Sequence, residues 1–419
     1  MMNVFKFGGA SVKDAAGIRN LYDIVSGERN YLVVVVSAFG KTTNALEEIH
    51  YAWRTGDASF REKYDAAAGY HLSVADELFG EGSEISRSLG GMFGSFYKKL
   101  LNSAPADFDH DYDMIVSMGE VWSTMIVEGY LRMRGLKTKW CDIRKLLKTD
   151  NRYREAGIIW EASRAAVTEA FTFKDADIYV TQGFIGATAS GEVTTLGREG
   201  SDYTAAVLAN MLDAGEVVVW KDVPGIMNAD PDWMPSAVTL EHLSYNEAVE
   251  MSFSGAKVIH PKTIKPLHNK KIPMHVRSFI DPDAGGTVIS EDAPDGPMST
   301  VFVRKEGQIL ISLLPKDLSF VMGDNLASLF HILASHGVKV SLVQAGAVSI
   351  NICADHEEPR ISNVLEELRK DYTILFNGGA EMLTVRHSSP GAAESVTGGK
   401  EVLLSQTTRN TVRMVVRDK

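Results

Sequence analysis

The sequence predicts an α/β protein followed by a smaller α+β module. Three observations support this fold class. Nearly pure β-branched runs such as Tyr31–Val36 are typical of parallel strands that are buried on both faces. Several such runs lead through small polar residues into helix-like segments, as βα units do. Beyond about Ile309 the pattern changes to short strand candidates that alternate with two helices.

Length and composition limit the classes of protein that fit. The 419 residues favour two or three domains, and 45% hydrophobic with 23% charged residues is a globular composition. A net charge of −11 disfavours nucleic acid and anionic membrane as partners. We see no signal peptide and no apolar run of the roughly 20 residues that a membrane span needs. Cys141 and Cys353 fit a reducing compartment, so we expect a soluble cytoplasmic protein.

Two strand candidates near the N-terminus each end in small polar residues. Asn3–Phe7, which carries Lys6, runs into GGAS at residues 8–11, and Tyr31–Val36 runs into SAFGKTTN at residues 37–44. Glycine lets backbone amides approach a phosphate, and ligands of open α/β sheets bind at the carboxyl ends of strands. The two turns therefore indicate one crevice, with an ordinary tight turn as the alternative for the glycine pair.

The next part of the chain has a helical pattern. Residues from about Ala45 to Phe108 predict a helical insertion beside the sheet. We expect a strand at Asp113–Met118, followed at once by Gly119 and Glu120. The alternative for Glu120 is an acid that is stabilised by the positive end of a helix.

Further strands and one helix follow before a linker. We expect strands at residues 137–141, 178–181, 216–220 and 272–277, and a hairpin at 182–195. Leu243–Met251 predicts an amphipathic helix with Ser244 and Glu247 as a capping box. Asp281–Pro297 is rich in Gly, Pro, Asp and Ser and indicates a linker or hairpin region.

The stretch GREGSDYTAA, Gly197–Ala206, predicts the capped start of a helix over Tyr203–Leu212. The N-terminus of a helix attracts anions, and Arg198 adds a guanidinium group whose parallel N–H donors suit a carboxylate or phosphate. Asp202 adds an anion for a substrate amine or a metal. The alternative is an ordinary capped helix with a surface arginine.

Two later segments indicate a nucleotide. The loop KDVPGIMNADP carries Lys221 and Asp222 and could hold a base and ribose, with a plain surface loop as the alternative. Lys257 lies in a predicted helix start, Ser254–Lys257, where the dipole disfavours a cation, and an anionic ligand would explain it. We interpret His260 as structural.

The C-terminal part predicts a βαβ-type module. Strand candidates lie at residues 309–313, 338–343, 348–353, 372–376, 381–385 and 412–416, and helices at 326–335 and 361–369. The charged groups of this module are scattered and form no clustered active-site candidate.

Taken in order, these segments resemble the aspartate kinase family of the amino-acid kinase superfamily. The motifs are KFGGAS (6–11), VVVSAFGKTTN (34–44), MGE (118–120), GREGSDYTAA (197–206), WKDVPGIMNADP (220–231) and SFSGAKVIHPKT (252–263). They cover about residues 3 to 280, and the ordered set is highly specific. The segment after Ile309 resembles the family's ACT-type regulatory region. The sequences of the motifs WKDVPG and GREGSDYTAAVLA are most similar to the kinase part of aspartate kinase–homoserine dehydrogenases. No dehydrogenase domain follows, so we expect a monofunctional enzyme.

The resemblance implies a three-layer α/β/α sandwich over residues 1–290 and a ferredoxin-like ACT domain over 291–419. The family usually continues past a strand like the one before Lys419 with one more helix and strand, so the ACT region is expected to be incomplete, insensitive to effectors, or completed by a partner subunit. ACT modules commonly pair, which implies a homodimer or a higher homo-oligomer.

The implied reaction is the MgATP-dependent phosphorylation of the side-chain carboxylate of L-aspartate to 4-phospho-L-aspartate. This is the first step toward lysine, threonine and methionine, and an amino acid is the expected effector. Phosphoryl transfer needs positioning and charge neutralisation. Mg²⁺ would be held mainly by phosphate oxygens and water, with no metal ligand expected from the protein.

The resemblance also assigns residues. Lys6 and Asp202 would be catalytic, Arg198 would clamp the α-carboxylate of aspartate, and Glu120 would contact its amine. Thr43 and Ser201 would complete the amino-acid pocket. The expected nucleotide-binding residues are Lys6, Gly8, Gly9, Lys221, Asp222, Met227, Lys257 and Val258.

Two departures from the family pattern bear on this assignment. Many members have Tyr and Arg where this chain has Met227 and Asp232, which affects base stacking and one phosphate contact. Lysine-inhibited members tend to have Asp and a Thr-Ser pair where we align Ser341 and the pair Ala345-Gly346, which weakens the case for lysine inhibition.

Two alternatives stay open from the sequence. One is another amino-acid kinase, of the glutamate or acetylglutamate type, although MGE, SFSGAKVIHP and an ACT-like tail favour aspartate. The other is a catalytically inactive, ACT-based amino-acid sensor, against which the retained site residues argue: Lys6, Glu120, Arg198, Asp202 and Lys257.

Overall fold

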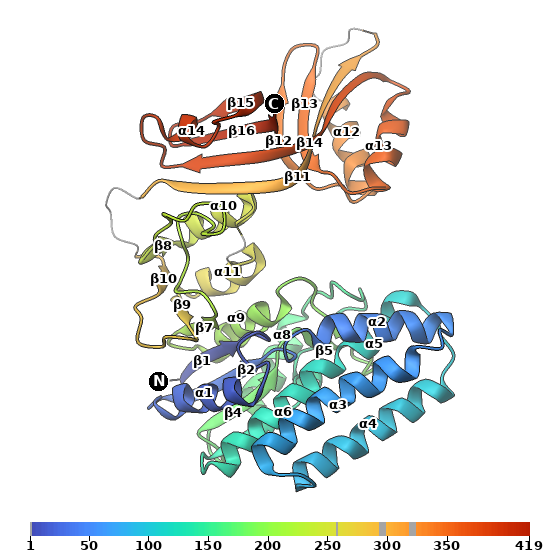
Figure 1. The fold of residues 1–419 in the computed structure, drawn as a ribbon, viewed down its shortest axis with the longest axis vertical. Coiled ribbons are helices and arrows are strands. Elements are labelled where there is room, and N and C mark those ends of the chain that lie inside the picture. Colours follow the sequence, from blue (N-terminus) through green and yellow to red (C-terminus); the bar gives the residue numbers. More distant parts are fainter. Residues whose placement is uncertain (1, 257–258, 293–298, 318–323) are drawn as a thin grey trace. The chain divides into compact units, whose positions relative to one another are not determined.

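The computed structural model describes residues 2–256, 259–292, 299–317 and 324–419. The chain divides into two compact units. The first comprises residues 1–226, 241–248 and 259–294, and the second 227–240, 249–258 and 295–419. Figure 1 shows both with their labelled elements.

The first unit is built on an eight-stranded sheet in the order β3-β4-β2-β1-β7-β9-β10-β8. Its strands are β1 (Met2–Phe7), β2 (Tyr31–Val36), β3 (Thr138–Cys141), β4 (Ile178–Gln182), β7 (Val217–Lys221), β8 (His242–Ser244), β9 (Met274–Ser278) and β10 (Thr287–Ser290). The strands from β3 to β9 pair in parallel, and β10 is antiparallel to β9. The valine run of β2 lies fully buried at the centre, as predicted.

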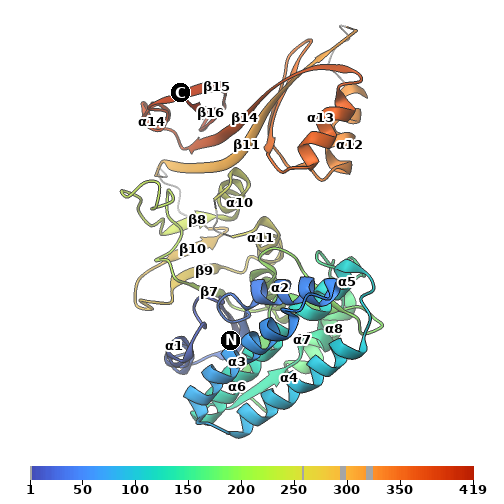
Figure 2. The same ribbon diagram turned by 45° about the vertical axis from the view of Figure 1, so that its right-hand side comes forward.

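Helices cover both faces of this sheet. They are α1 (Ala15–Ser26), α2 (Thr42–Thr55), α3 (Phe60–Phe79), α4 (Glu84–Asn102), α5 (Phe108–Val116), α6 (Met118–Met133), α7 (Ile143–Leu146), α8 (Trp160–Ala170), α9 (Gly200–Leu212), α10 (Tyr245–Ser254) and α11 (Pro261–His268). Helix α6 packs on β3 and β4, with α1 and α3 beside it. Helix α9 packs on β1 and β7, with α8 and α11 beside it. The predicted α/β/α sandwich is therefore confirmed (Figure 2).

The predicted strand at Asp113–Met118 is wrong, because this segment is helical. Helix α5 ends at Val116 and α6 starts at Met118. The carboxylate of Asp107 accepts hydrogen bonds from the amides of Asp109 and His110, and this cap starts α5. The apolar run within DMIVSM is too short for its periodicity to separate a buried helix from a strand.

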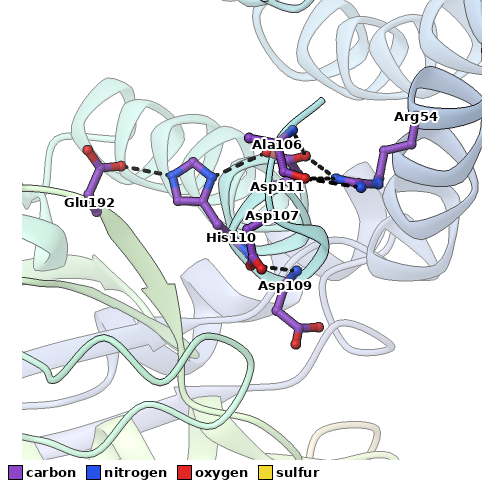
Figure 3. Close-up of polar contacts among 7 residues, drawn as sticks. All are labelled: Arg54, Ala106, Asp107, Asp109, His110, Asp111 and Glu192. Atoms are coloured by element: carbon purple, nitrogen blue, oxygen red, sulfur yellow. Dashed lines mark hydrogen bonds and ion pairs between the residues drawn. The ribbon is translucent and has the colours of Figure 1, made fainter. Parts of the chain in front are cut away.

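Figure 3 shows the polar contacts that tie the start of α5 to its neighbours. The Nε2 atom of His110 lies 3.0 Å from the carboxylate of Glu192, and its Nδ1 atom lies 3.3 Å from Asp111. Hydrogen bonding to Glu192 raises the pKa of His110. Arg54, at the end of α2, forms an ion pair with Asp111. These contacts join the helical region to the hairpin of β5 (Ile185–Ala187) and β6 (Val193–Thr195).

The segment after β7 differs from the prediction at two points. Residues 242–244 form β8, so α10 begins at Tyr245, although the Ser244 hydroxyl does accept from the Glu247 amide at 3.1 Å as expected. Ser254 ends α10 and does not start a helix. Of the two alternatives predicted after Asp281, a linker or a hairpin region, the hairpin is observed, because β10 pairs antiparallel with β9.

The second unit is an antiparallel six-stranded sheet in the order β12-β13-β11-β14-β16-β15. Its elements are β11 (Val301–Pro315), α12 (Asp324–Ser335), β12 (Val340–Ala345), β13 (Ile350–Asp355), α13 (Arg360–Leu368), β14 (Tyr372–Arg386), α14 (Ala392–Ser395), β15 (Lys400–Thr407) and β16 (Thr411–Asp418). From β11 to the first half of β14 the order is βαββαβ, which is the predicted ferredoxin-like arrangement.

Two long strands carry separate clusters of buried side chains. Helices α12 and α13 pack on one half of the sheet through residues such as Ile311, Leu329 and Val364. A second cluster forms where β14 pairs with β16, around Leu383 and Val416. The strands expected at 372–376 and 381–385 are one continuous strand, β14, and β15 was not predicted.

Candidate active site

The turns after β1 and β2 are held together at the carboxyl edge of the sheet. The Gly40 amide donates to the Gly9 carbonyl at 2.9 Å, and the Ser37 amide donates to the Phe7 carbonyl at 3.1 Å. A Cβ atom on Gly9 would lie 2.4 Å from the carbonyl oxygen of Ala38, so only glycine permits this approach. The two turns that the sequence predicted to face one site are thus in direct contact.

A buried ion-pair cluster lies beside these turns. The Nζ atom of Lys6, on β1, is 2.5 Å from Asp202 Oδ1, and the Nζ atom of Lys221, at the end of β7, is 3.6 Å from Asp202 Oδ2. Lys6 and Asp202 are both buried. Burial alone would raise the pKa of Asp202, but the charges of Lys6 and Lys221 lower it below its ordinary value. Asp202 is therefore a carboxylate between two cations.

Glu120 brings a second buried carboxyl group from the first turn of α6. Its Oε1 atom accepts from the Ala38 amide at 3.3 Å, and none of the described residues provides a hydrogen-bond partner for Oε2. Burial raises the pKa of Glu120 to about 8, although the Ala38 amide and the charge of Lys6 act against this rise. A buried oxygen without a partner is costly, so Glu120 is suited to receive a polar or cationic group.

The loop before α9 carries Arg198. Helix α9 begins at Gly200, earlier than predicted, and the residue before it, Glu199, adopts a left-handed backbone and makes no side-chain cap. The expectation of a side-chain-capped helix start is therefore wrong. Arg198 is exposed, and within the part of the chain that the structure describes its guanidinium has no ion-pair partner. An anion could bind it without displacing a protein group.

Other predicted site residues surround the same edge. Ser201 is buried and packs so closely on Gly183 that a Cβ atom there would lie 2.5 Å from the serine Cβ. Thr43 is half-buried in the first turn of α2, a helix that also lacks a side-chain cap. A Cβ atom on Gly8 would lie 3.6 Å from Lys6 Nζ. Asp222 is exposed in the loop that follows β7.

The remaining predicted nucleotide-binding residues are Met227, Lys257 and Val258. Met227 belongs to the second unit, where it forms a β-bridge with Thr239. Lys257 and Val258 lie outside the described residues. His260 has a structural position, as expected, because its Nδ1 atom accepts from the Lys262 amide and caps α11.

Sequence reasoning missed one residue that supports the site. Asp113 of α5 is fully buried and accepts from the Thr195 amide at 2.8 Å, the Thr195 hydroxyl at 2.7 Å and the Arg154 amide at 2.9 Å. Thr195 ends β6, directly before the loop that carries Arg198. No motif signals this role, because it depends on a contact between distant segments.

Two searches of the described residues gave negative findings. No group of three or more His, Cys, Asp or Glu side chains among them could hold a metal ion. No helix among them is both long and apolar enough to cross a membrane.

Comparisons with known proteins agree on one family. The model of the amino acid kinase family matches residues 1–278. Lysine-sensitive aspartokinase 3 of Escherichia coli K12 is 35% identical over 84% of this chain and 78% of that protein. Chloroplastic aspartokinase 1 of Arabidopsis thaliana is 30% identical over 92% of this chain and 71% of that protein. The chain spans only 43% of the bifunctional aspartokinase/homoserine dehydrogenase 2 of Arabidopsis thaliana, at 29% identity.

Solved structures show the same similarity. E. coli aspartokinase III in complex with aspartate and ADP, in the R-state, matches with a TM-score of 0.86 at 29% identity and covers 100% of this chain and 96% of that chain. The T-state complex of the same protein with lysine and aspartate matches with a TM-score of 0.79 at 29% identity, covering 99% of this chain and 96% of that chain.

Proposed function

This chain belongs to the amino acid kinase family and, within it, to the aspartokinases, and on this premise we propose how its residues phosphorylate L-aspartate. The enzyme transfers a phosphoryl group from ATP to the side-chain carboxylate, with Mg²⁺ as the metal. The observation that carries the assignment of roles is the Lys6–Asp202–Lys221 cluster at the strand ends, in which Lys6 and Asp202 are buried.

Lys6 is proposed to neutralise the transferring phosphoryl group. Negative charge on the phosphoryl oxygens during transfer is best stabilised by a cation that is already positioned and shielded from water. The carboxylate of Asp202 positions the cations in this way, because it forms ion pairs with the ammonium groups of Lys6 and Lys221. Asp202 thus acts with Lys6, and Lys221 faces the same carboxylate.

Aspartate is proposed to bind between Arg198 and Glu120. The exposed guanidinium of Arg198 would form two parallel hydrogen bonds with the α-carboxylate. The carboxylate of Glu120 would accept a hydrogen bond from the amine of aspartate, and this bond would give its buried Oε2 atom a partner. Ser201 and Thr43 would complete the pocket with hydroxyl groups.

The residues at the strand ends fit MgATP. When bound, MgATP supplies the phosphoryl group and part of the neutralising charge. The amides of Gly8 and Gly9 and the ammonium of Lys6 would hold its phosphates, because the Gly8 turn lies next to Lys6 Nζ, which is 3.6 Å from the position of a Cβ atom on Gly8. Lys221 and Asp222 would line the ribose and base, and Met227, Lys257 and Val258 remain proposed nucleotide contacts.

Trapping the product with hydroxylamine tests the function. We expect aspartyl hydroxamate to form only with ATP, Mg²⁺ and the protein together. Glutamyl hydroxamate without the aspartyl product would instead support a glutamate-type kinase. No hydroxamate from either amino acid would favour the inactive sensor.

We also propose a homodimer that forms through the second unit. Within the described part of the chain, residues 372–377 of β14 pair with β11 only, whereas β16 pairs with residues 381–386, so the first half of β14 has an open edge there. Leu375 and Phe376 are exposed there. An open, apolar edge strand is suited to pair with a second copy.

Light scattering during size-exclusion chromatography checks the homodimer. Leu375→Asp should reduce the mass from dimer to monomer, because it places a charge on the pairing edge. Val402→Asp is the matched control, since Val402 is also an exposed apolar strand residue but belongs to β15, the terminal strand beyond β16. A dimer that survives Leu375→Asp, or that is lost in the control, would contradict this interface.

A cytoplasmic location and an amino-acid effector complete the proposal. Cys141 and Cys353 are free and buried, which fits a reducing compartment. The ferredoxin-like half of the second unit is the proposed place for the effector, as the similarity to a lysine complex of aspartokinase III supports.

A further inference from the structure

The loop that carries Arg198 is attached to the start of α11 at two points, one on each side of the arginine. The ammonium of Lys262 donates to the Leu196 carbonyl at 2.7 Å. The His260 amide donates to the Glu199 carboxylate, also at 2.7 Å. Since the Lys262 amide in turn donates to His260 Nδ1, the two attachment points are joined to each other.

Glu199 occupies a backbone conformation that favours glycine. Its φ of 53° and ψ of 29° are left-handed, and Gly197 on the other side of Arg198 is left-handed as well. Residues with a side chain adopt this region at a cost, so the surroundings must maintain it. Glu199 is the N-cap residue of α9, yet its carboxylate bonds to α11 and not to its own helix. The side chain therefore serves the loop and not the capping of α9.

Lys262 is also committed to this loop. Its side chain is half-buried, and this burial lowers the pKa of its ammonium group. The Nζ atom lies 5.5 Å from the centre of the Tyr203 ring and within hydrogen-bond distance of the Leu196 carbonyl. Withdrawing a cation from water is costly unless it is bonded, so the hydrogen bond to the loop stabilises the ammonium group in this place.

We propose that Glu199 and Lys262 are positioning residues that hold the guanidinium of Arg198 in the orientation that grips the substrate carboxylate. The inference rests on the proposed function, because it takes the role of Arg198 from there. Neither residue is assigned a contact with substrate. Both act through the backbone on either side of Arg198.

Steady-state kinetics of four variants test this role. Glu199→Ala and Lys262→Met should each raise the KM for aspartate about 5- to 10-fold, as the loss of one typical hydrogen bond does, and leave kcat and the KM for ATP within about 2-fold. Glu199→Gln should stay close to wild type, because its amide oxygen can still accept from His260. Glu199→Gly should resemble Glu199→Ala, although it removes the backbone strain.

Hydrogen exchange without substrate provides a second readout. The amides of residues 196–203 should exchange at least about 10-fold faster in Glu199→Ala and Lys262→Met than in wild type and Glu199→Gln, if the contacts hold the loop. Unchanged exchange, or an unchanged aspartate KM in both variants of an active enzyme, would overturn the proposal. An inactive wild-type protein would refute the proposed function, and the exchange data would still decide whether the loop is held.

Discussion

At the scale of single residues, the burial of Glu120 has a consequence for substrate binding. Its carboxyl group is protonated in the free protein at neutral pH, since burial raises its pKa to about 8 from an ordinary value near 4.5. The folded protein also favours the protonated form of Glu120 over the charged form. The contribution of this preference to folding stability is fully present below the ordinary pKa of 4.5 and is lost as the pH rises toward 8.

We expect aspartate binding to release a proton from Glu120. The substrate amine is a cation and favours the carboxylate, so affinity should increase as the pH rises from 6 to 8, by at most about 10-fold per pH unit, and then level off. Titration calorimetry in two buffers of different ionisation enthalpy measures the number of protons released on aspartate binding. Glu120→Gln should bind more weakly and show no such slope, and a wild-type slope in this variant would contradict the assignment.

Motif resemblance predicted Lys6, Glu120 and Asp202 as residues of the candidate site but not their pairing. The structure places Lys6 and Asp202 in one ion pair. Composition and spacing could not reveal the contact of Lys221 with Asp202, because it depends on the parallel register of β1 and β7. The roles of Glu199 and Asp113 have no local signal at all.

At the scale of elements, the site depends on the contact between the turns after β1 and β2. Gly9 and Gly8 are neighbours in sequence but differ in their surroundings. A methyl group on Gly9 would collide with the backbone of Ala38, whereas one on Gly8 would meet only the end of the Lys6 side chain.

Gly9→Ala should therefore destabilise the protein, and Gly8→Ala should not. We expect a loss of about 1–3 kcal/mol for Gly9→Ala, as forced overpacking costs elsewhere, and little change for Gly8→Ala. Urea denaturation measures both. In Gly8→Ala, kcat/KM for ATP should still fall, since the methyl group occupies space beside Lys6. Equal stabilities of the two variants would show that the turns can separate without cost.

Elements were predicted well where periodicity is strong and poorly where apolar runs are short. The valine run of β2 and the helices α12 and α13 were expected close to their observed positions. Helix α5 was taken for a strand because MIV alone carries no period. The glycines within FNGGAE suggested a break, but β14 continues through them, opposite a register irregularity in β11 between Lys305 and Gln308.

At the scale of the whole molecule, the second unit has a ferredoxin-like half whose polar groups around Ser341 are already paired. Ser341, where the resemblance predicts an Asp in lysine-inhibited members, is buried, and its hydroxyl accepts from the ammonium of Lys305 at 2.9 Å. Lys305 is also 2.5 Å from Asp355. The ammonium group of Lys305 is thus already bonded to both polar groups, the Ser341 hydroxyl and the Asp355 carboxylate.

We expect lysine not to inhibit this enzyme. Hydroxamate formation should stay within about 20% of the uninhibited rate at lysine concentrations that inhibit E. coli aspartokinase III in a parallel assay, since no free carboxylate at Ser341 awaits an effector ammonium. Threonine and methionine belong in the same titration. Half-maximal inhibition by lysine would show that a different set of groups binds it.

The two long strands of the second unit have a mechanical meaning. The ladder between β11 and β14 runs without a loop from Val301 and Arg386 to Pro315 and Tyr372, so it spans both clusters of buried side chains. The two clusters share the same two backbones, so a change in strand twist at one of them reaches the other through β11 and β14. The register irregularities of β11 at Gln308 lie between the clusters and mark the place where the ladder bends most easily.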